Sequence, residues 1–411
     1  MKAAVMGYGT VGRGVCEILT EKNGSLSAKC AGREITLGRV LDIRDLSDTP
    51  VKAVWTTQFE EIVNDPEIGV VVETMGGTHP AFEFCMRSLQ AGKSVVTSNK
   101  QLVAEKGEAL FAAARENNVG FRFGAAVCGG IPVIRTMFYG LAANEILSFS
   151  GILNGTTNFI LTKMIKEKTS FAAALREAQE KGYAERDPAA DIEGTDACRK
   201  TAILASAAFG THIPAEEIHT EGITAITSED VSYAAGVGSK IKLLGRAKRL
   251  ENGKIYALVS PAIVPDTELI SGVEGVYNAL CIHGDKVGDI LLYGQGAGRE
   301  ATASAVTADV LDCVRNPGFD ETYSWKNREE GRLIPYEDMT LRLYVRGYAS
   351  DVKTAVSGIR ETFDGAVLLE RENAPENEIA FFTGAAKERD LRENISALRC
   401  FAAASVIRVE E

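Results

Sequence analysis

A glycine-rich turn near the start of the chain constrains the fold more than any other feature of the sequence. Residues 2–6 form a short apolar run, and Gly7-Tyr8-Gly9-Thr10-Val11-Gly12 follows at once, ahead of a helical pattern that continues to Glu21. Glycines at this GxGxxG spacing permit a tight turn between a first strand and a first helix, and they let a pyrophosphate approach the helix-terminal N–H groups. The turn predicts a dinucleotide site formed by Gly7, Gly9, Thr10, Val11 and Gly12.

Strand and helix patterns alternate after this turn. We predict strands at residues 35–43, 51–56, 69–74, 94–97 and 119–127. Helical patterns lie around Glu60 and over residues 82–89 and 102–116. Such alternation indicates a parallel, doubly wound sheet. The fold class is therefore α/β, with a Rossmann dinucleotide-binding domain predicted over residues 1–130.

Two neighbouring residues leave the choice between NAD and NADP open. Asp42, at the end of the second predicted strand, suits the ribose hydroxyls of NAD, whereas Arg44 suits the 2′-phosphate of NADP. The ends of later strands place two more loops in the crevice where ligands sit in such sheets. Further cofactor contacts are predicted at Thr74, Gly76, Ser98 and Lys100.

Residues 182–200, GYAERDPAADIEGTDACRK, concentrate charge ahead of an apolar helical pattern. On charge alone, a solvated acidic loop is one interpretation. Asp196 and Lys200 stand four residues apart, so a helix that begins by Thr195 puts them on one face. Small apolar residues follow, which predicts a buried helix and a partly dehydrated lysine that can transfer a proton near neutral pH.

Composition argues against several classes of protein. The net charge of −11, with no lysine or arginine cluster, argues against nucleic acid or an anionic membrane as a partner. No signal peptide or membrane-spanning run is found, so we expect a cytoplasmic location. The eight cysteines include no CxxC pair, which disfavours a zinc site or a disulfide framework. Only Cys128, in AVCGG, has a setting that could expose a nucleophile, and a small buried thiol is the alternative.

The regular alternation ends after residue 127, and three further regions are predicted. Residues 131–315 have a mixed α/β pattern and are expected to form the substrate and dimerisation domain. Residues 316–338 are polar, carry Pro317 and Pro335, and are typical of a linker. Residues 339–411 follow the order strand, helix, strand, strand, helix, strand, which is a ferredoxin-like arrangement.

The acid-rich stretch resembles the signature of homoserine dehydrogenases. The resemblance extends to GYGTVGRG, SNKQLVA, CGGIPVI, NGTTNFIL and YGQGAGREATASAVTAD, and it covers residues 1–315. It implies reduction of L-aspartate 4-semialdehyde to L-homoserine with NADPH or NADH, a step of threonine, methionine and isoleucine biosynthesis. It also implies a small-molecule substrate and a homodimer or homotetramer.

The same resemblance implies roles for individual residues. Lys100 and Lys200 are the two catalytic lysines, and Asp196 orients Lys200 or the substrate amine. Glu185 and Asp191 bind the amino end of the substrate, which suits an ammonium group. Gly155, Thr156 and Tyr183 shape the substrate pocket. Gly298 lies near the nicotinamide, where the helix over residues 300–315 packs back on the first domain, and a core helix without ligand contact is the alternative.

Members of the family also bind sodium or a similar monovalent cation at the CGGIP turn. Val127, Gly129 and Ile131 match the positions that supply carbonyl oxygens. Gly124 stands where the family has a glutamate ligand. The carbonyl set is therefore expected without its carboxylate.

The C-terminal region resembles the ACT regulatory domain often attached to this family. Ala349-Ser350-Asp351 replaces the usual effector loop after the first strand. Binding of an amino-acid effector such as threonine, and a structural or dimerising role, are both left open.

Two other functions are alternatives to a homoserine dehydrogenase. A phosphorylating semialdehyde dehydrogenase would need a nucleophilic thiol such as Cys128. A non-catalytic amino-acid or nucleotide sensor would not need the set of Lys100, Asp196 and Lys200.

Overall fold

The computed structural model describes residues 1–410, and the chain divides into two compact units. The first unit comprises Met1–Ile146, Ala202–Ala215 and Gly294–Glu329. The second comprises Leu147–Thr201, Glu216–Tyr293 and the chain from Glu330 onward. No helix in residues 1–410 is long and apolar enough to cross a membrane.

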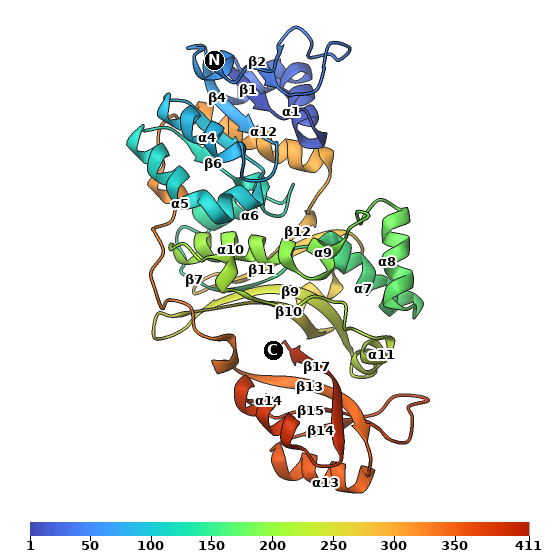
Figure 1. Cartoon of the computed structure of the whole chain (residues 1–411). Helices are drawn as coiled ribbons and strands as arrows, with labels where there is room; N and C mark the ends of the chain where they lie inside the picture. The colour runs from blue at the N-terminus through green and yellow to red at the C-terminus, as the bar shows by residue number, and fades with distance from the viewer. Residues whose placement is uncertain (411) are drawn as a thin grey trace. The chain divides into compact units, whose positions relative to one another are not determined.

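The first unit contains a parallel sheet of six strands, counted over the described residues, in the order β3-β2-β1-β4-β5-β6. This is the strand order of the Rossmann fold and confirms the predicted doubly wound sheet. Strands β1, β2, β4 and β6 of this sheet are labelled in Figure 1. The strands are β1 (Lys2–Met6), β2 (Thr36–Leu41), β3 (Trp55–Thr56), β4 (Ile68–Glu73), β5 (Ser94–Thr97) and β6 (Phe121–Arg122). The main helices are α1 (Thr10–Glu21), α2 (Asn23–Lys29), α3 (Glu60–Val63), α4 (Ala81–Gln90), α5 (Lys100–Glu116) and α12 (Arg299–Arg315).

Two predicted strands are reduced to two residues each in the structure. β3 has only two residues, because the chain before it forms a turn in which the Val54 N–H donates to the Val51 oxygen at 2.9 Å. β6 ends at Arg122, because the Gly124 N–H donates to the Asp309 side chain at 2.8 Å instead of continuing the ladder. The apolar run alone did not reveal either interruption.

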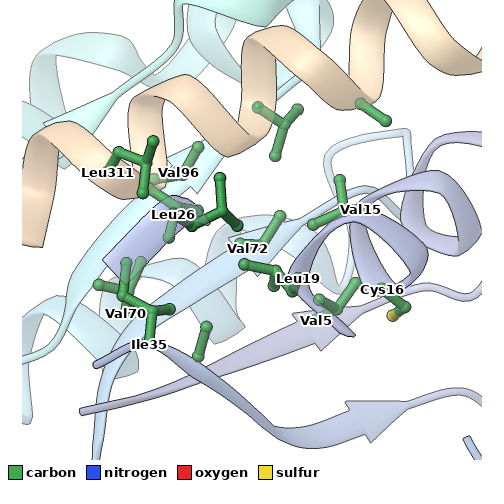
Figure 2. Close-up of a cluster of buried hydrophobic side chains, with 14 of the residues drawn as sticks. Val5, Val15, Cys16, Leu19, Leu26, Ile35, Val70, Val72, Val96 and Leu311 are labelled. Atoms are coloured by element: carbon green, nitrogen blue, oxygen red, sulfur yellow. The ribbon is translucent and has the colours of Figure 1, made fainter. Parts of the chain in front are cut away.

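The core of the first unit lies between the sheet and two helices that are far apart in sequence. Val15 and Leu19 of α1 are buried against Val5 and Val72 of the sheet, and Leu311 of α12 belongs to the same cluster (Figure 2). A Cβ added at Gly14 would lie 2.8 Å from the Ala303 Cβ, so α1 and α12 approach each other closely. Helix α12 therefore completes the core around the first strand and helix.

The segment predicted as a linker, residues 316–338, carries buried aromatic side chains. Tyr323 and Trp325 are buried, and their rings lie 5.1 Å from the ring of Phe123 in each case. This part of the segment therefore belongs to the core of the first unit. The assignment of domain boundaries stays a prediction.

The second unit contains an eleven-stranded mixed sheet, counted over residues 1–410. Its main path is β12-β11-β7-β9-β10-β17-β13-β15-β14. The strands before the C-terminal region are β7 (Ile146–Ile152), β8 (His219–Thr220), β9 (Ser239–Arg249), β10 (Ile255–Pro265), β11 (Tyr277–Gly284) and β12 (Gly288–Gln295). The helices are α7 (Gly155–Glu167), α8 (Phe171–Glu180), α9 (Ala189–Ile192), α10 (Thr195–Phe209) and α11 (Ser228–Gly236).

The C-terminal region has the predicted order of strands and helices, with one additional two-residue strand before its second helix. It comprises β13 (Thr340–Ala349), α13 (Val352–Thr362), β14 (Val367–Leu369), β15 (Glu378–Phe382), β16 (Ala386–Lys387), α14 (Glu388–Ala397) and β17 (Phe401–Val409). Both helices lie against the sheet (Figure 1). Ile359 of α13 and Leu391 of α14 belong to the same buried cluster as Phe381 of β15. β17 also pairs in parallel with β10, joining Ala262 to Arg408 and Ile263 to Val409. One continuous sheet therefore runs through the second unit.

Candidate active site

The GxGxxG turn forms a cradle, and its glycines differ in how much space surrounds them. A Cβ at Gly12 would lie 1.9 Å from the Gly7 oxygen, and Gly7 has a φ of +93°. A Cβ at Gly9 would meet nothing within 4 Å, so this position opens toward solvent at the N-terminus of α1. Gly7 and Gly12 thus allow the tight turn, and Gly9 leaves the approach to the helix N-terminus clear for a phosphate group.

A hollow of about 260 Å³ lies beside this cradle. Three arginines line it: Arg13 from α1, Arg44 from the loop after β2, and Arg299 from α12. The other lining residues are Tyr8, Gly9 and Thr10. Arginines in an open hollow next to a glycine-rich turn suit phosphate groups, so the residues present fit a dinucleotide.

Asp42 and Arg44 form a tight pair in the structure. The Arg44 Nη2 lies 2.7 Å from the Asp42 Oδ2, and its Nε lies 2.9 Å from Oδ1. The same carboxylate accepts the Tyr8 N–H at 2.7 Å. The side-chain hydrogen bond from Arg44 lowers the pKa of Asp42 to about 2 despite burial. Both Asp42 oxygens are thus engaged within the protein.

The loops after β4 and β5 are joined by a buried glutamate that the sequence did not single out. Glu73 accepts the Thr97 hydroxyl at 2.6 Å and the N–H groups of Met75 and Gly76 at 2.7 and 3.2 Å. Burial raises the pKa of Glu73, although these hydrogen bonds act to lower it. The Thr74 hydroxyl donates to the Gly7 oxygen at 2.8 Å, so this loop also contacts the cradle.

Asn99 connects the same two loops and begins α5. Its Nδ2 donates to the Gly77 oxygen at 2.6 Å, and its Oδ1 accepts the Leu102 N–H as the helix cap. Ser98 and Lys100 flank Asn99, so both predicted residues sit where α5 begins. The structure thus places Thr74, Gly76, Ser98 and Lys100 on two linked loops at the carboxyl ends of the strands.

Lys200 and Asp196 form the buried pair that their spacing predicts. Helix α10 begins at Thr195, and the Lys200 Nζ lies 2.7 Å from the Asp196 Oδ2. The Lys200 ammonium also donates to the Leu153 oxygen at 2.7 Å. Both side chains are buried, so the lysine is held in one orientation at the start of a buried helix.

Asn154 links the acids around Lys200 and was missed from the sequence. Its Nδ2 lies 2.6 Å from the Asp191 Oδ1 and 2.9 Å from the Asp196 Oδ2. Its Oδ1 accepts the Thr157 N–H, which caps α7. An asparagine just before a helical pattern is a typical capping signal, but its contact with two distant aspartates could not be read from the sequence.

The remaining predicted substrate residues fall into two groups. Thr156 and Gly155 lie in the first turn of α7, where the Thr156 hydroxyl donates to the Tyr183 oxygen at 2.6 Å. A Cβ at Gly155 would lie 2.6 Å from the Val276 oxygen, which leaves no space for a side chain there. The Tyr183 and Glu185 side chains are exposed, so the structure does not bring them into the group formed by the half-buried Asp191 and the buried Asp196 and Lys200.

Near the CGGIP turn, a carboxylate from another element lies beside Gly124, the position where the family has a glutamate. Asp309 reaches the position next to Gly124, where its Oδ2 would lie 3.0 Å from an added Cβ. This carboxylate is buried, its pKa is raised to about 6 by that burial, and Arg135 lies 3.8 Å from it. In residues 1–410 there is no group of three or more His, Cys, Asp or Glu side chains that could hold a metal.

One of the carbonyl groups of this turn takes part in a local backbone hydrogen bond. The Ile131 oxygen accepts the Val133 N–H at 2.7 Å. Ligation by Val127, Gly129 and Ile131 stays a prediction, and no step of the reaction is assigned to a cation. Cys128 is buried, and Gly298, with a φ of +114°, is the residue before α12.

Comparison with known proteins places almost all of these elements in one family. Residues 7–124 match the family model described as "Homoserine dehydrogenase, NAD binding domain", and residues 132–311 match the one described as "Homoserine dehydrogenase". The homoserine dehydrogenase of Pseudomonas aeruginosa is 45% identical over 77% of this chain and 72% of its own length.

Solved structures agree with the sequence comparisons. A homoserine dehydrogenase from Thiobacillus denitrificans is 37% identical and superposes with a TM-score of 0.89 over 100% of this chain and 98% of its own. A hyperthermophilic archaeal homoserine dehydrogenase in complex with NADPH is 28% identical, with a TM-score of 0.65 over 77% of this chain and 98% of its own.

These matches identify the reaction of the chain. The protein is an NAD(P)-dependent oxidoreductase that interconverts L-aspartate 4-semialdehyde and L-homoserine. The chain belongs to the homoserine dehydrogenase family.

Proposed function

We propose that Lys200 is the proton-transfer group of this homoserine dehydrogenase and that Asp196 holds it in place. The observation that carries the proposal is the buried ion pair, with Nζ 2.7 Å from Oδ2 and 2.7 Å from the Leu153 oxygen. When bound, the nicotinamide cofactor would supply hydride to the aldehyde carbon. The role of Lys200 would be to donate a proton from its ammonium to the carbonyl oxygen, which becomes the hydroxyl of homoserine.

Asp191 is proposed to bind the substrate ammonium. Its Oδ1 accepts one hydrogen bond, from the Asn154 Nδ2. The side chain is half-buried beside the Asp196–Lys200 pair. A carboxylate in this position suits an amino-acid substrate. Glu185, Tyr183 and Lys100 keep the substrate and catalytic roles that the family resemblance implies, and each can be tested by its own alanine variant.

NADP is proposed as the preferred cofactor. Asp42 is fully engaged by Arg44 and the Tyr8 N–H, which weakens it as an acceptor for a ribose hydroxyl. Arg13, Arg44 and Arg299 line the hollow and suit a 2′-phosphate. The archaeal relative solved with NADPH supports this choice.

The deciding experiment is an initial-rate comparison of homoserine oxidation with NADP and with NAD. We expect activity with both and a higher kcat/KM with NADP. Folded protein without activity on either cofactor would refute the reaction, and a higher kcat/KM with NAD would refute the cofactor preference alone. The same assay with and without threonine tests the C-terminal region as an effector site.

A homodimer or homotetramer in the cytoplasm completes the proposal. Tyr277 and Tyr293 stack at 5.1 Å and are both exposed on β11 and the edge strand β12. Exposed aromatic side chains on a sheet edge are typical of subunit interfaces. None of the eight cysteines, all of which lie in residues 1–410, forms a disulfide, as suits a reducing compartment. Light scattering on the purified chain measures the oligomeric state directly.

A further inference from the structure

Arg408, three residues before the C-terminus, is a buried arginine held between two glutamates. Its Nη1 and Nη2 donate to the two oxygens of Glu221 at 2.8 Å each. Its Nε and Nη2 donate to Glu388, at the start of α14, at 2.8 and 2.6 Å. One guanidinium thus joins the C-terminal region to the segment that follows β8.

Glu221 is strongly ionised in this position. Burial alone would raise the pKa of Glu221, but the hydrogen bonds and charge of Arg408, with His219 beside it, lower the value to about 2. The pair therefore keeps both charges over the whole physiological pH range.

The segment anchored by Glu221 packs against the end of α9. The Ile223 N–H donates to the Ile192 oxygen at 2.8 Å. A Cβ at Gly222 would lie 2.1 Å from the same oxygen, so the two backbones are in direct contact. On the other side, the Glu221 N–H donates to the Val259 oxygen of β10 at 2.8 Å.

The backbone at this contact also carries the substrate-side acids. Ile192 follows Asp191 directly, and Gly194 leads into α10, which holds Asp196 and Lys200. A Cβ at Gly194 would lie 3.0 Å from the Thr220 Cγ2 and 3.4 Å from the Glu221 oxygen. A shift of the Glu221 segment would therefore move the residues that present Asp191 and Asp196.

We propose that Arg408 is a positioning residue for substrate binding, acting through Glu221 and the backbone contact between Ile223 and Ile192. This inference rests on the proposed substrate role of Asp191 and Asp196. It gives the last strand of the chain a function in the reaction beyond completing the sheet.

A second arginine in the same region provides a matched control. Arg346 of β13 is also buried between two carboxylates, with Nε 2.7 Å from the Asp230 Oδ1 and Nη1 3.5 Å from the Glu378 Oε2. Asp230 lies in the first turn of α11, in a capping box with Thr227, and not in the segment that meets α9. Both arginines are thus buried and paired with two carboxylates. Only Arg408 has a partner, Glu221, in the segment that contacts α9.

The test uses the full-length chain with Arg408→Met, Arg408→Lys, Arg346→Met and Asp191→Asn. We expect Arg408→Met to raise the KM for homoserine by roughly 3- to 30-fold, with the KM for NADP changed by less than about twofold. Arg408→Lys should fall between the wild type and Arg408→Met, because an ammonium cannot hold both carboxylates in the fork geometry. Arg346→Met should lower the melting temperature and leave the KM for homoserine unchanged.

The outcomes separate the two levels of the proposal. A wild-type KM for homoserine in folded Arg408→Met, or an equal rise in Arg346→Met, would overturn the positioning role. If Asp191→Asn raises the KM while Arg408→Met does not, only the positioning role fails. If Asp191→Asn also has a wild-type KM, the substrate role of Asp191 fails, and this inference with it. Should Arg408→Met not fold, Arg408→Lys and Glu221→Gln carry the same comparison.

Discussion

Two carboxylate–cation pairs, Asp42 with Arg44 and Asp196 with Lys200, have the same shortest N···O distance of 2.7 Å. Their surroundings differ. The Arg44 side chain is 60% exposed, whereas that of Lys200 is 11% exposed. The exposed arginine can turn from Asp42 to a phosphate at little cost, while the buried lysine is fixed by Asp196 and the Leu153 oxygen. The first pair therefore suits recognition of a cofactor, and the second suits proton transfer at a defined position.

Breaking the buried Asp196–Lys200 pair should have the largest effect on activity. Lys200→Ala should lower kcat by about 10²–10⁴, the usual contribution of a proton-transfer group, with the KM for NADP nearly unchanged. Steady-state kinetics measure both values. Lys181→Ala, at an exposed lysine of the neighbouring segment, is the control and should keep full activity. A parallel loss of cofactor affinity in Lys200→Ala would assign the lysine to binding.

Stability should separate the two pairs as well. Lys200→Met should reduce the free energy of unfolding by roughly 3 kcal/mol, because it leaves the Asp196 charge buried without its cation. Arg44→Met should reduce it by only about 1 kcal/mol, because the lost guanidinium is exposed and Asp42 keeps its hydrogen bonds from the Tyr8 and residue-44 backbone N–H groups. Urea unfolding of the two variants gives the comparison. Equal losses would mean that burial does not distinguish the pairs.

Arg44 should matter more for cofactor choice than for stability. Arg44→Ala should raise the KM for NADP by roughly 10- to 100-fold, the effect of one charge-assisted pair, and should leave the KM for NAD unchanged or lower. Arg39→Ala provides the control, because Arg39 lies on β2, the strand that precedes the Arg44 loop, and pairs with Glu61. Equal effects on both cofactors would place Arg44 away from the 2′-phosphate.

The smallest effect concerns pH. The folded-state pKa of Asp42 is lowered to about 2, so its pairing stabilises the protein above its unfolded pKa of about 4 and this contribution is lost as the pH falls toward 2. The stability difference between wild type and Arg44→Met should be constant from pH 5 to 8 and shrink below pH 4. Chemical unfolding across this range checks it, and a difference that grows on acidification would contradict the assignment.

Local patterns predicted much of the fold and part of the site. The Rossmann turn, the strand at residues 94–97 and the order of elements after residue 339 are confirmed by the structure. The Asp196–Lys200 pair is confirmed because a spacing of four residues on a helix fixes the neighbours of a side chain. By contrast, Glu73 and Asn154 were missed, since their partners lie far away in the sequence.

At the predicted cation site, too, the sequence did not reveal a contact with a distant residue. The sequence shows that Gly124 lacks a carboxylate, and only the structure places Asp309 of α12 beside it, next to Arg135. The C-terminal region was predicted as a separate module, yet β17 pairs with β10 and Arg408 binds Glu221.

Short-range periodicity and spacing were thus sufficient for the dinucleotide turn, the parallel sheet and the lysine–aspartate pair, because neighbours within one element set these features. The folded chain alone decided which distant groups meet. Asn154 joins Asp191 to Asp196, Arg44 occupies both Asp42 oxygens, and Arg408 supports the segment behind Ile192. Such contacts depend on how strands far apart in sequence pair in one sheet, and no local pattern carries that information.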